Sequence, residues 1–169
     1  VQKQIIEETD IAVSSIAVYD MAAKSRYGIK GFYDAKEVLY GIEEKAKLGL
    51  DLMTIHASVQ KKDLKFFESN QRVIPCTSRG GTMVLENIKK TSEENFYYTY
   101  FDDILDIAKE YQVTISLGAI FRPANIYDAM NENFMYWEEI SRNAELVERA
   151  NAKGVSCMVE GIGHCPINL

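Results

Sequence analysis

Short runs rich in β-branched residues alternate with longer segments of helical period along most of this 169-residue chain. The runs expected to form strands are 11–19, 51–57, 72–77, 113–118 and 154–161. The main segments expected to form helices are 34–48, 60–68, 101–111 and 131–152. This alternation is typical of repeated βα units around a parallel sheet. It predicts an α/β fold, either a doubly wound sheet or a partial (βα)8 barrel, because five strands cannot close an eight-stranded barrel.

The longest helical segment, 131–152, carries apolar residues at a spacing that favours one buried face. The residues expected on or near that face are Trp137, Ile140, Ala144, Leu146 and Val147. No stretch rich in proline, glycine or serine interrupts the chain. We therefore expect residues 1–169 to belong to a single domain.

Composition and charge exclude several classes of protein. A net charge of −6 argues against a general nucleic-acid binder, which needs a basic surface to neutralise phosphates. No apolar run approaches the roughly 20 residues that cross a bilayer, so no membrane association is expected. The first residues do not resemble a secretory signal, and the expected location is the cytoplasm.

Polar residues at the ends of the predicted strands are the first candidates for a site. Parallel α/β folds build their sites at the carboxyl edge of the sheet. Tyr19 ends the first run, and its phenol can stack on a ligand, hydrogen-bond to it, or form an amphipathic edge of the core. His56 ends the second run, where an imidazole can bind a ligand or a metal, or can be a structural histidine.

Two further strand ends carry glycine with polar partners. In Ser78-Arg79-Gly80-Gly81, a hydroxyl, a guanidinium and backbone donors can surround a phosphate or a carboxylate. The alternative is a glycine-rich turn with a solvated arginine. In EGIGHCP, residues 160–166, Glu160 and His164 can bind a divalent metal or support proton transfer, or His164 can simply be hydrogen-bonded within a glycine turn.

Six motifs in a fixed order resemble the phosphomethylpyrimidine synthase family of the thiamine pathway. They are VYDMA (18–22), DLMTIHASV (51–59), SRGGTM (78–83), ENFYYTYFDDILDIAKEYQVTISLG (94–118), FRPANIYDA (121–129) and MVEGIGHCPIN (158–168). The resemblance covers nearly the whole chain. It implies a (βα)8 catalytic barrel in a homodimeric radical S-adenosylmethionine lyase with a [4Fe–4S] cluster. Such an enzyme converts 5-aminoimidazole ribonucleotide to 4-amino-5-hydroxymethyl-2-methylpyrimidine phosphate.

The resemblance also implies roles for individual residues. A metal ion, zinc or another divalent cation, is expected on His164. The residues expected to bind the substrate are Tyr19, His56, Ser78, Arg79, Gly80, Arg122 and Glu160. These expectations agree with the strand-end positions of most of the same residues.

Departures from the family pattern keep two other functions open. The family's D-G-L-R segment becomes Ala119-Ile120-Phe121-Arg122, without its carboxylate, and a thiol, Cys165, follows His164. The three cysteines are expected to be reduced, and the family's C-x-x-C-x4-C cluster motif and second metal-binding histidine are not found. We therefore expect part of a catalytic barrel without its cluster segment. The alternatives are the related 5-hydroxybenzimidazole synthase of cobamide biosynthesis and a noncatalytic ligand-binding module.

Overall fold

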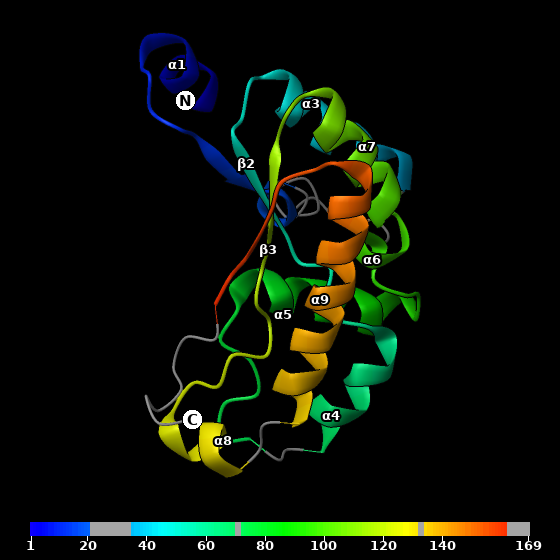
Figure 1. Cartoon of the computed structure of the whole chain (residues 1–169). Helices are drawn as coiled ribbons and strands as arrows, with labels where there is room; N and C mark the ends of the chain where they lie inside the picture. Colours follow the sequence, from blue (N-terminus) through cyan, green and yellow to red (C-terminus); the bar gives the residue numbers. More distant parts are fainter. Residues whose placement is uncertain (21–34, 70–71, 132–133, 162–169) are drawn as a thin grey trace.

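The centre of the molecule is a parallel sheet of four strands in the order β1-β2-β3-β4 (Figure 1). The computed structural model describes residues 1–20, 35–69, 72–131 and 134–161. The strands are β1 (Ser14–Ile16), β2 (Leu52–Ile55), β3 (Thr114–Leu117) and β4 (Cys157–Val159). All neighbouring pairs are parallel, and the sheet is not closed. The predicted α/β fold with parallel βα units is confirmed, in a form consistent with a partial barrel.

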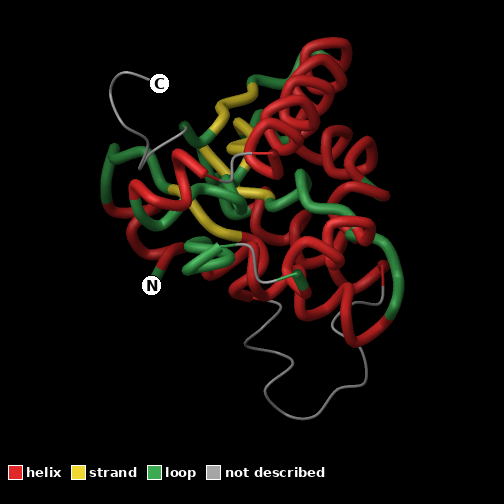
Figure 2. The backbone as a smooth tube through the Cα atoms, turned by 90° about the horizontal axis from the view of Figure 1, so that it is seen from below, coloured by secondary structure: helices red, strands yellow, loops and turns green. Residues whose placement is uncertain are grey.

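Three long helices form the layer beside this sheet. Helix α7 contacts both α3 and α9, and α9 also packs on β4. Figure 2 shows the strands inside the molecule and helical segments toward its outside. The helices of the described residues are α1 (Gln2–Glu8), α3 (Ala35–Lys47), the 3-10 helix η1 (Lys61–Asp63), α4 (Leu64–Glu68), α5 (Arg79–Thr91), α6 (Phe96–Thr99), α7 (Phe101–Glu110), α8 (Ile126–Asn131) and α9 (Phe134–Lys153).

The two faces of the sheet differ in character because successive side chains of a strand point to opposite sides. On one face, Met53 is in register with Ile115 and Ile55 with Leu117, and all four side chains are fully buried in the core. On the other face, two hydroxyl residues, Thr54 and Ser116, are in register. The residues two positions beyond this polar pair are His56 and Gly118, so the polar face leads to the predicted site.

The strand predicted over 72–77 does not form, and this prediction is wrong. Residues 72–75 are bends, and Pro75 has no N–H to donate to a sheet. The N–H groups of Val73 and Ile74 instead donate to the carboxylate of Asp128, at 2.9 and 3.2 Å. A side chain therefore satisfies the backbone donors that a neighbouring strand would have satisfied.

The predicted buried face of α9 is wrong at two positions. Trp137 is 55% exposed and Ala144 is also exposed, although Leu146 is fully buried as expected. The side of α9 that faces the molecule carries three buried polar residues, Glu139, Arg142 and Asn143. The spacing of apolar residues does not reveal such a face, because polar residues are expected to face the solvent.

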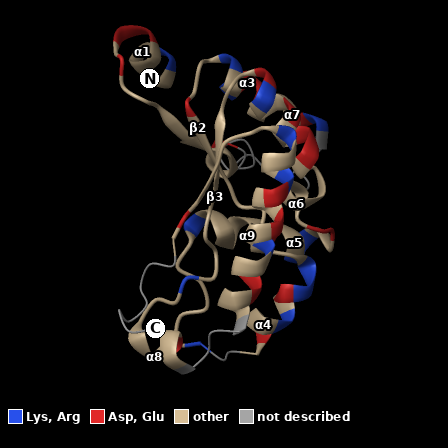
Figure 3. Cartoon of the chain, in the orientation of Figure 1, with Lys and Arg blue, Asp and Glu red and all other residues tan. Residues whose placement is uncertain are grey.

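Charged side chains mark the outer surface of the helices. Figure 3 shows acidic and basic residues interspersed along α3, α7 and α9. Charged residues of the helices also form ion pairs of the i, i+4 type, such as Lys47 with Glu43 in α3 and Lys90 with Glu86 in α5. Within the described residues, no helix has the length and apolar character needed to span a bilayer.

Two substitutions in α9 test the burial seen here. We expect Leu146→Ala to lower the free energy of unfolding by about 2–5 kcal/mol, because it leaves a cavity in the core. Trp137→Ala should cost less than about 1 kcal/mol, because the indole is mostly in solvent. Urea denaturation of both variants measures the difference. A larger loss for the tryptophan variant would contradict this placement of the helix.

Candidate functional site

The ends of the four strands bring most of the predicted site residues to one edge of the sheet. The N–H of Gly118 donates to the carbonyl of Ile55, and that of Glu160 donates to the carbonyl of Leu117, both at 3.0 Å. These bonds extend the parallel pairing beyond the assigned strands. His56, Gly118 and Glu160 therefore lie side by side at the carboxyl ends of β2, β3 and β4, where parallel α/β folds bind ligands.

The imidazole of His56 packs closely against backbone from two other elements. A Cβ atom built on Gly80 would lie 2.5 Å from Cε1 of His56, and one built on Gly118 would lie 2.8 Å from Cδ2. Real Cβ atoms do not approach this closely. A larger residue at either position would force the ring or the backbone to shift where the start of α5 and the end of β3 meet the imidazole. The predicted turn residue Gly80 has a steric role that its sequence position alone did not indicate.

His56 is held as a neutral imidazole. Its side chain is 5% exposed, and burial lowers its pKa to about 4, with the positive charge of Arg122 acting in the same direction. Among the described residues, its Nδ1 has no hydrogen-bond partner. A neutral imidazole has one donor and one acceptor, so this ring can donate a hydrogen bond to a bound molecule or accept one from it without a change in charge.

Helix α5 begins at the site and carries a cation there. Ser78 is its N-cap, and the Ser78 hydroxyl accepts a 3.0 Å hydrogen bond from the N–H of Gly81. The guanidinium of Arg79 lies 5.3 Å from the ring centroid of Tyr19, in the helical segment 17–20 that follows β1. A helix N-terminus and an arginine both favour an anion, so this corner suits a phosphate or carboxylate.

Arg122 and Glu160 form the opposite corner of the site. Nη2 of Arg122 lies 3.8 Å from Oε2 of Glu160, and both side chains are about 29% exposed. The same carboxylate oxygen accepts a 3.1 Å hydrogen bond from the N–H of Ala119. Nε of Arg122 is buried without a partner among the described residues. This corner therefore presents a partly exposed carboxylate beside a guanidinium whose Nε has no partner among the described residues.

Comparison with known proteins identifies the family. The sequence profile of the radical SAM ThiC family matches residues 1–169. The chain belongs to the radical SAM ThiC family. It is similar to phosphomethylpyrimidine synthases from Thermotoga petrophila, 38% identical over 170 residues, and Thermodesulfovibrio yellowstonii, 33% identical over 169 residues. A third such enzyme, from Methanocaldococcus jannaschii, is 38% identical over 170 residues.

These ThiC relatives are longer than the chain. The alignments cover 99% of this chain but 40% of the Thermotoga petrophila enzyme and 39% of the other two. The chain therefore spans about two-fifths of the length of the curated relatives it matches.

The structure brings together the seven residues predicted to bind the substrate, and the eighth predicted site residue lies outside the described part of the chain. Gly80 touches His56, whose pKa responds to Arg122, and Arg122 faces Glu160. Tyr19, Ser78 and Arg79 join this group through α5. The metal ligand His164 lies outside the described residues. Within the described ranges, no three His, Cys, Asp or Glu side chains come together to hold a metal ion. Roles in substrate binding stay predictions.

Two described cysteines, Cys76 and Cys157, are free thiols. Burial raises the pKa of both Cys76 and Cys157, so each favours its protonated form. The thiol of Cys76 lies 3.2 Å from the carbonyl oxygen of Ile120 and packs against the core. Cys165, the third cysteine, lies outside the described residues.

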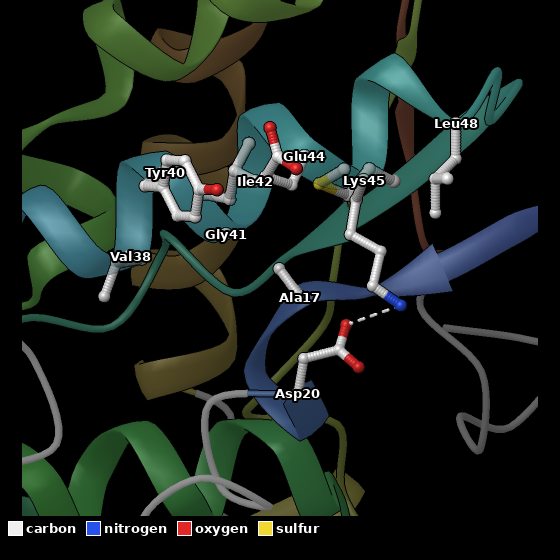
Figure 4. Close-up of a pocket in the computed structure, with 10 residues that line it drawn as sticks. Ala17, Asp20, Val38, Tyr40, Gly41, Ile42, Glu44, Lys45 and Leu48 are labelled. Carbon is white, nitrogen blue, oxygen red and sulfur yellow. Dashed lines mark ion pairs between the residues drawn. The ribbon is translucent and has the colours of Figure 1, made fainter.

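A separate cavity of about 310 Å³ lies beside α3 (Figure 4). Its lining is mainly apolar, with Tyr40 and Leu48 among the residues that contribute. An ion pair in this lining joins Lys45 to Asp20 at 3.1 Å. None of the predicted site residues that the structure describes lines this cavity, so the strand-end group is the better candidate for the chemistry of a ThiC protein.

The sequence interpretation missed Gly118 and Glu139. Gly118 closes the second side of the His56 contact, and Glu139 is a fully buried carboxylate that bonds to the backbone just beyond β3. The glycine at the end of a predicted strand was the available signal for the first. No pattern in the sequence distinguishes Glu139 from the solvated glutamates on the same helix.

The low pKa of His56 predicts a specific loss of stability in acid. The folded-state pKa of about 4 lies below the ordinary value of 6.5, so protons bind preferentially to the unfolded chain. The contribution of His56 is complete above about pH 6.5 and is lost as the pH falls toward 4. Between pH 7 and 5, the free energy of unfolding of the unmodified chain should fall more steeply than that of His56→Gln.

Urea denaturation at several pH values measures both profiles. The difference in slope isolates His56, because every other titrating group is common to the two proteins. It should approach but not exceed about 1.4 kcal/mol per pH unit, the limit for one proton. Parallel profiles would show that the imidazole is not held neutral by the fold.

Proposed function

We propose that this chain forms the ribonucleotide-binding part of the catalytic barrel of a phosphomethylpyrimidine synthase. In this proposal the complete enzyme converts 5-aminoimidazole ribonucleotide to hydroxymethylpyrimidine phosphate in thiamine biosynthesis. The observation that carries the proposal is the strand-end group, which places an arginine at a helix N-terminus beside a buried neutral histidine. Membership of the ThiC family and relatives named phosphomethylpyrimidine synthase support it.

The phosphate of the substrate is assigned to the start of α5. Arg79 supplies a full positive charge, and the first backbone N–H groups of a 13-residue helix supply donors. The Ser78 hydroxyl oxygen already accepts the capping bond from Gly81 and so shapes the turn, while its O–H can still donate to the phosphate. This arrangement suits a phosphomonoester, because a dianion gains from both the cation and the helix terminus.

The heterocycle and ribose are assigned to the other side of the site. His56 is neutral, and its Nδ1 has no partner among the described residues, so we assign its imidazole to a polar edge of the substrate. Glu160 is partly exposed and can accept hydrogen bonds from hydroxyl groups, while Arg122 balances its charge. In this proposal the side chains orient the substrate, and none of them performs the bond cleavage.

The cofactors belong to the proposal for the complete enzyme. S-adenosylmethionine and a [4Fe–4S] cluster would supply the radical chemistry when bound. The described residues include two free cysteines, Cys76 and Cys157, and no three ligating side chains gather among those residues to hold a cluster. A divalent metal such as zinc is proposed on His164. We further propose that the enzyme is a cytoplasmic homodimer.

One feature favours 5-hydroxybenzimidazole synthase as a second candidate. Ala119, where the family pattern has an aspartate, is 4% exposed at the end of β3, and its N–H contacts Glu160. An acceptor for substrate hydroxyl groups is therefore replaced by a methyl group at the site itself. Both enzymes use the same ribonucleotide, so they are distinguished by the product formed rather than by substrate binding.

The proposed phosphate site predicts the effect of charge removal at one end of α5. Arg79→Ala should weaken binding of 5-aminoimidazole ribonucleotide about 10- to 100-fold, because a charged hydrogen bond contributes about 1.5–3 kcal/mol. Lys89→Ala, which removes an exposed cation from the last turn of the same helix, should leave affinity unchanged. Isothermal titration calorimetry compares the two. Equal effects would reject the site.

A further inference from the structure

Glu139 is a buried carboxylate whose contacts all lead toward the strand-end group. We propose that Glu139 is a positioning residue: it holds the backbone of residues 119–122 in place and thereby fixes Arg122 against His56 and Glu160. The inference rests on the proposed function only in taking this group to be the ligand site. The arrangement itself can be measured without any ligand.

The contacts of Glu139 show what it holds. Its side chain lies on α9 and is 2% exposed. Oε1 accepts hydrogen bonds from the N–H of Ile120 at 2.6 Å and from the hydroxyl of Ser58 at 2.7 Å. Oε2 accepts from the N–H of Phe121 at 2.7 Å. Both carboxylate oxygens are thus used as acceptors. Two of the three donors are backbone N–H groups, which can donate a hydrogen bond but cannot accept one.

The segment beyond β3 needs such a partner. After Gly118 the chain leaves the sheet, and Ile120 and Phe121 are fully buried. Within the described residues no strand accepts from their N–H groups, and a buried unpaired N–H costs about 1–3 kcal/mol. Glu139 takes the place of that strand. Burial raises the pKa of Glu139, whereas the three donors and the charge of Arg122 act to lower it.

The other side of the same segment is held from residues 72–77. Nη1 of Arg72 donates to the carbonyl of Phe121 at 2.7 Å, and the hydroxyl of Thr77 donates to the carbonyl of Arg122 at 3.2 Å. This segment is therefore bonded to α9 through the N–H groups of Ile120 and Phe121, and to the segment before α5 through the carbonyls of Phe121 and Arg122. Its path is defined by side chains on both sides.

The helix that carries Glu139 is itself anchored to the end of β2. Arg142, about one turn further along α9, is buried, donates to the carbonyl of Ser58 at 3.0 Å and forms an ion pair with Asp63. Ser58 lies two residues after His56 and bonds to both helix residues. Glu139 therefore links the ends of β2 and β3, the two elements that present His56 and Arg122.

A double-mutant cycle tests this link. The pKa of His56, followed by NMR of its ring protons, reports the charge of Arg122, which helps to lower it. Arg122→Met should raise this pKa in the otherwise unmodified chain. In a Glu139→Gln background, the same substitution should raise it by less than half as much, because the amide group of glutamine cannot accept from both N–H groups and Arg122 is no longer held in place.

The neighbouring residue supplies the control. Glu138→Gln removes a partly exposed carboxylate from the same turn of α9, where it pairs with Arg142, and should leave the full effect of Arg122→Met. Should Glu139→Gln fail to fold, Glu139→Asp keeps the charge but draws it back by one methylene, and it should also reduce the effect.

The two proposals fail separately. An equal effect of Arg122→Met in the Glu139 variants and in the unmodified chain would overturn the positioning role. If Arg122→Met has a reduced effect in the Glu139 variants but the chain binds no ribonucleotide, the positioning role stands and only the proposed function is rejected.

Discussion

The contact of the His56 ring with the backbone of Gly80 and Gly118 is the constraint on which the strand-end group depends. It joins the end of β2 to the start of α5 and to the end of β3. The approach is so close that a Cβ atom on either glycine would lie less than 3.0 Å from the ring. Because α5 begins there, Arg79 reaches the ring of Tyr19, which follows β1. A small rigid contact thus sets the positions of chemical groups from four elements.

Beyond the short strands, side chains rather than neighbouring strands hold the backbone. Glu139 receives two N–H groups after β3, and Asp128 receives two N–H groups from the segment before α5. Both carboxylates are buried, and each accepts hydrogen bonds from two backbone N–H groups. Such networks specify one path for the chain, because a single broken bond leaves a polar group unpaired in the core. This order allows loop residues such as Arg122 to form a defined site.

The sequence predicted the features that depend on repeated pattern. The alternation of strand and helix segments indicated the parallel α/β fold, and position at strand ends selected His56 and Glu160. The predictions that failed have local causes. The apolar run 72–77 is a loop because Pro75 cannot donate to a sheet and Asp128 binds the backbone N–H groups there. Trp137 lies in solvent because polar residues occupy the buried side of α9. Glu139 could not be found, because its role depends on backbone groups brought to it by the tertiary fold.

Product analysis tests the central claim most directly. The complete open reading frame that contains this chain would be expressed without oxygen, its cluster reconstituted, and the enzyme supplied with S-adenosylmethionine, reductant and 5-aminoimidazole ribonucleotide. Mass spectrometry should detect hydroxymethylpyrimidine phosphate, and none should form in a control without S-adenosylmethionine. Hydroxybenzimidazole as the product, or no product from an enzyme with an intact cluster, would contradict the account.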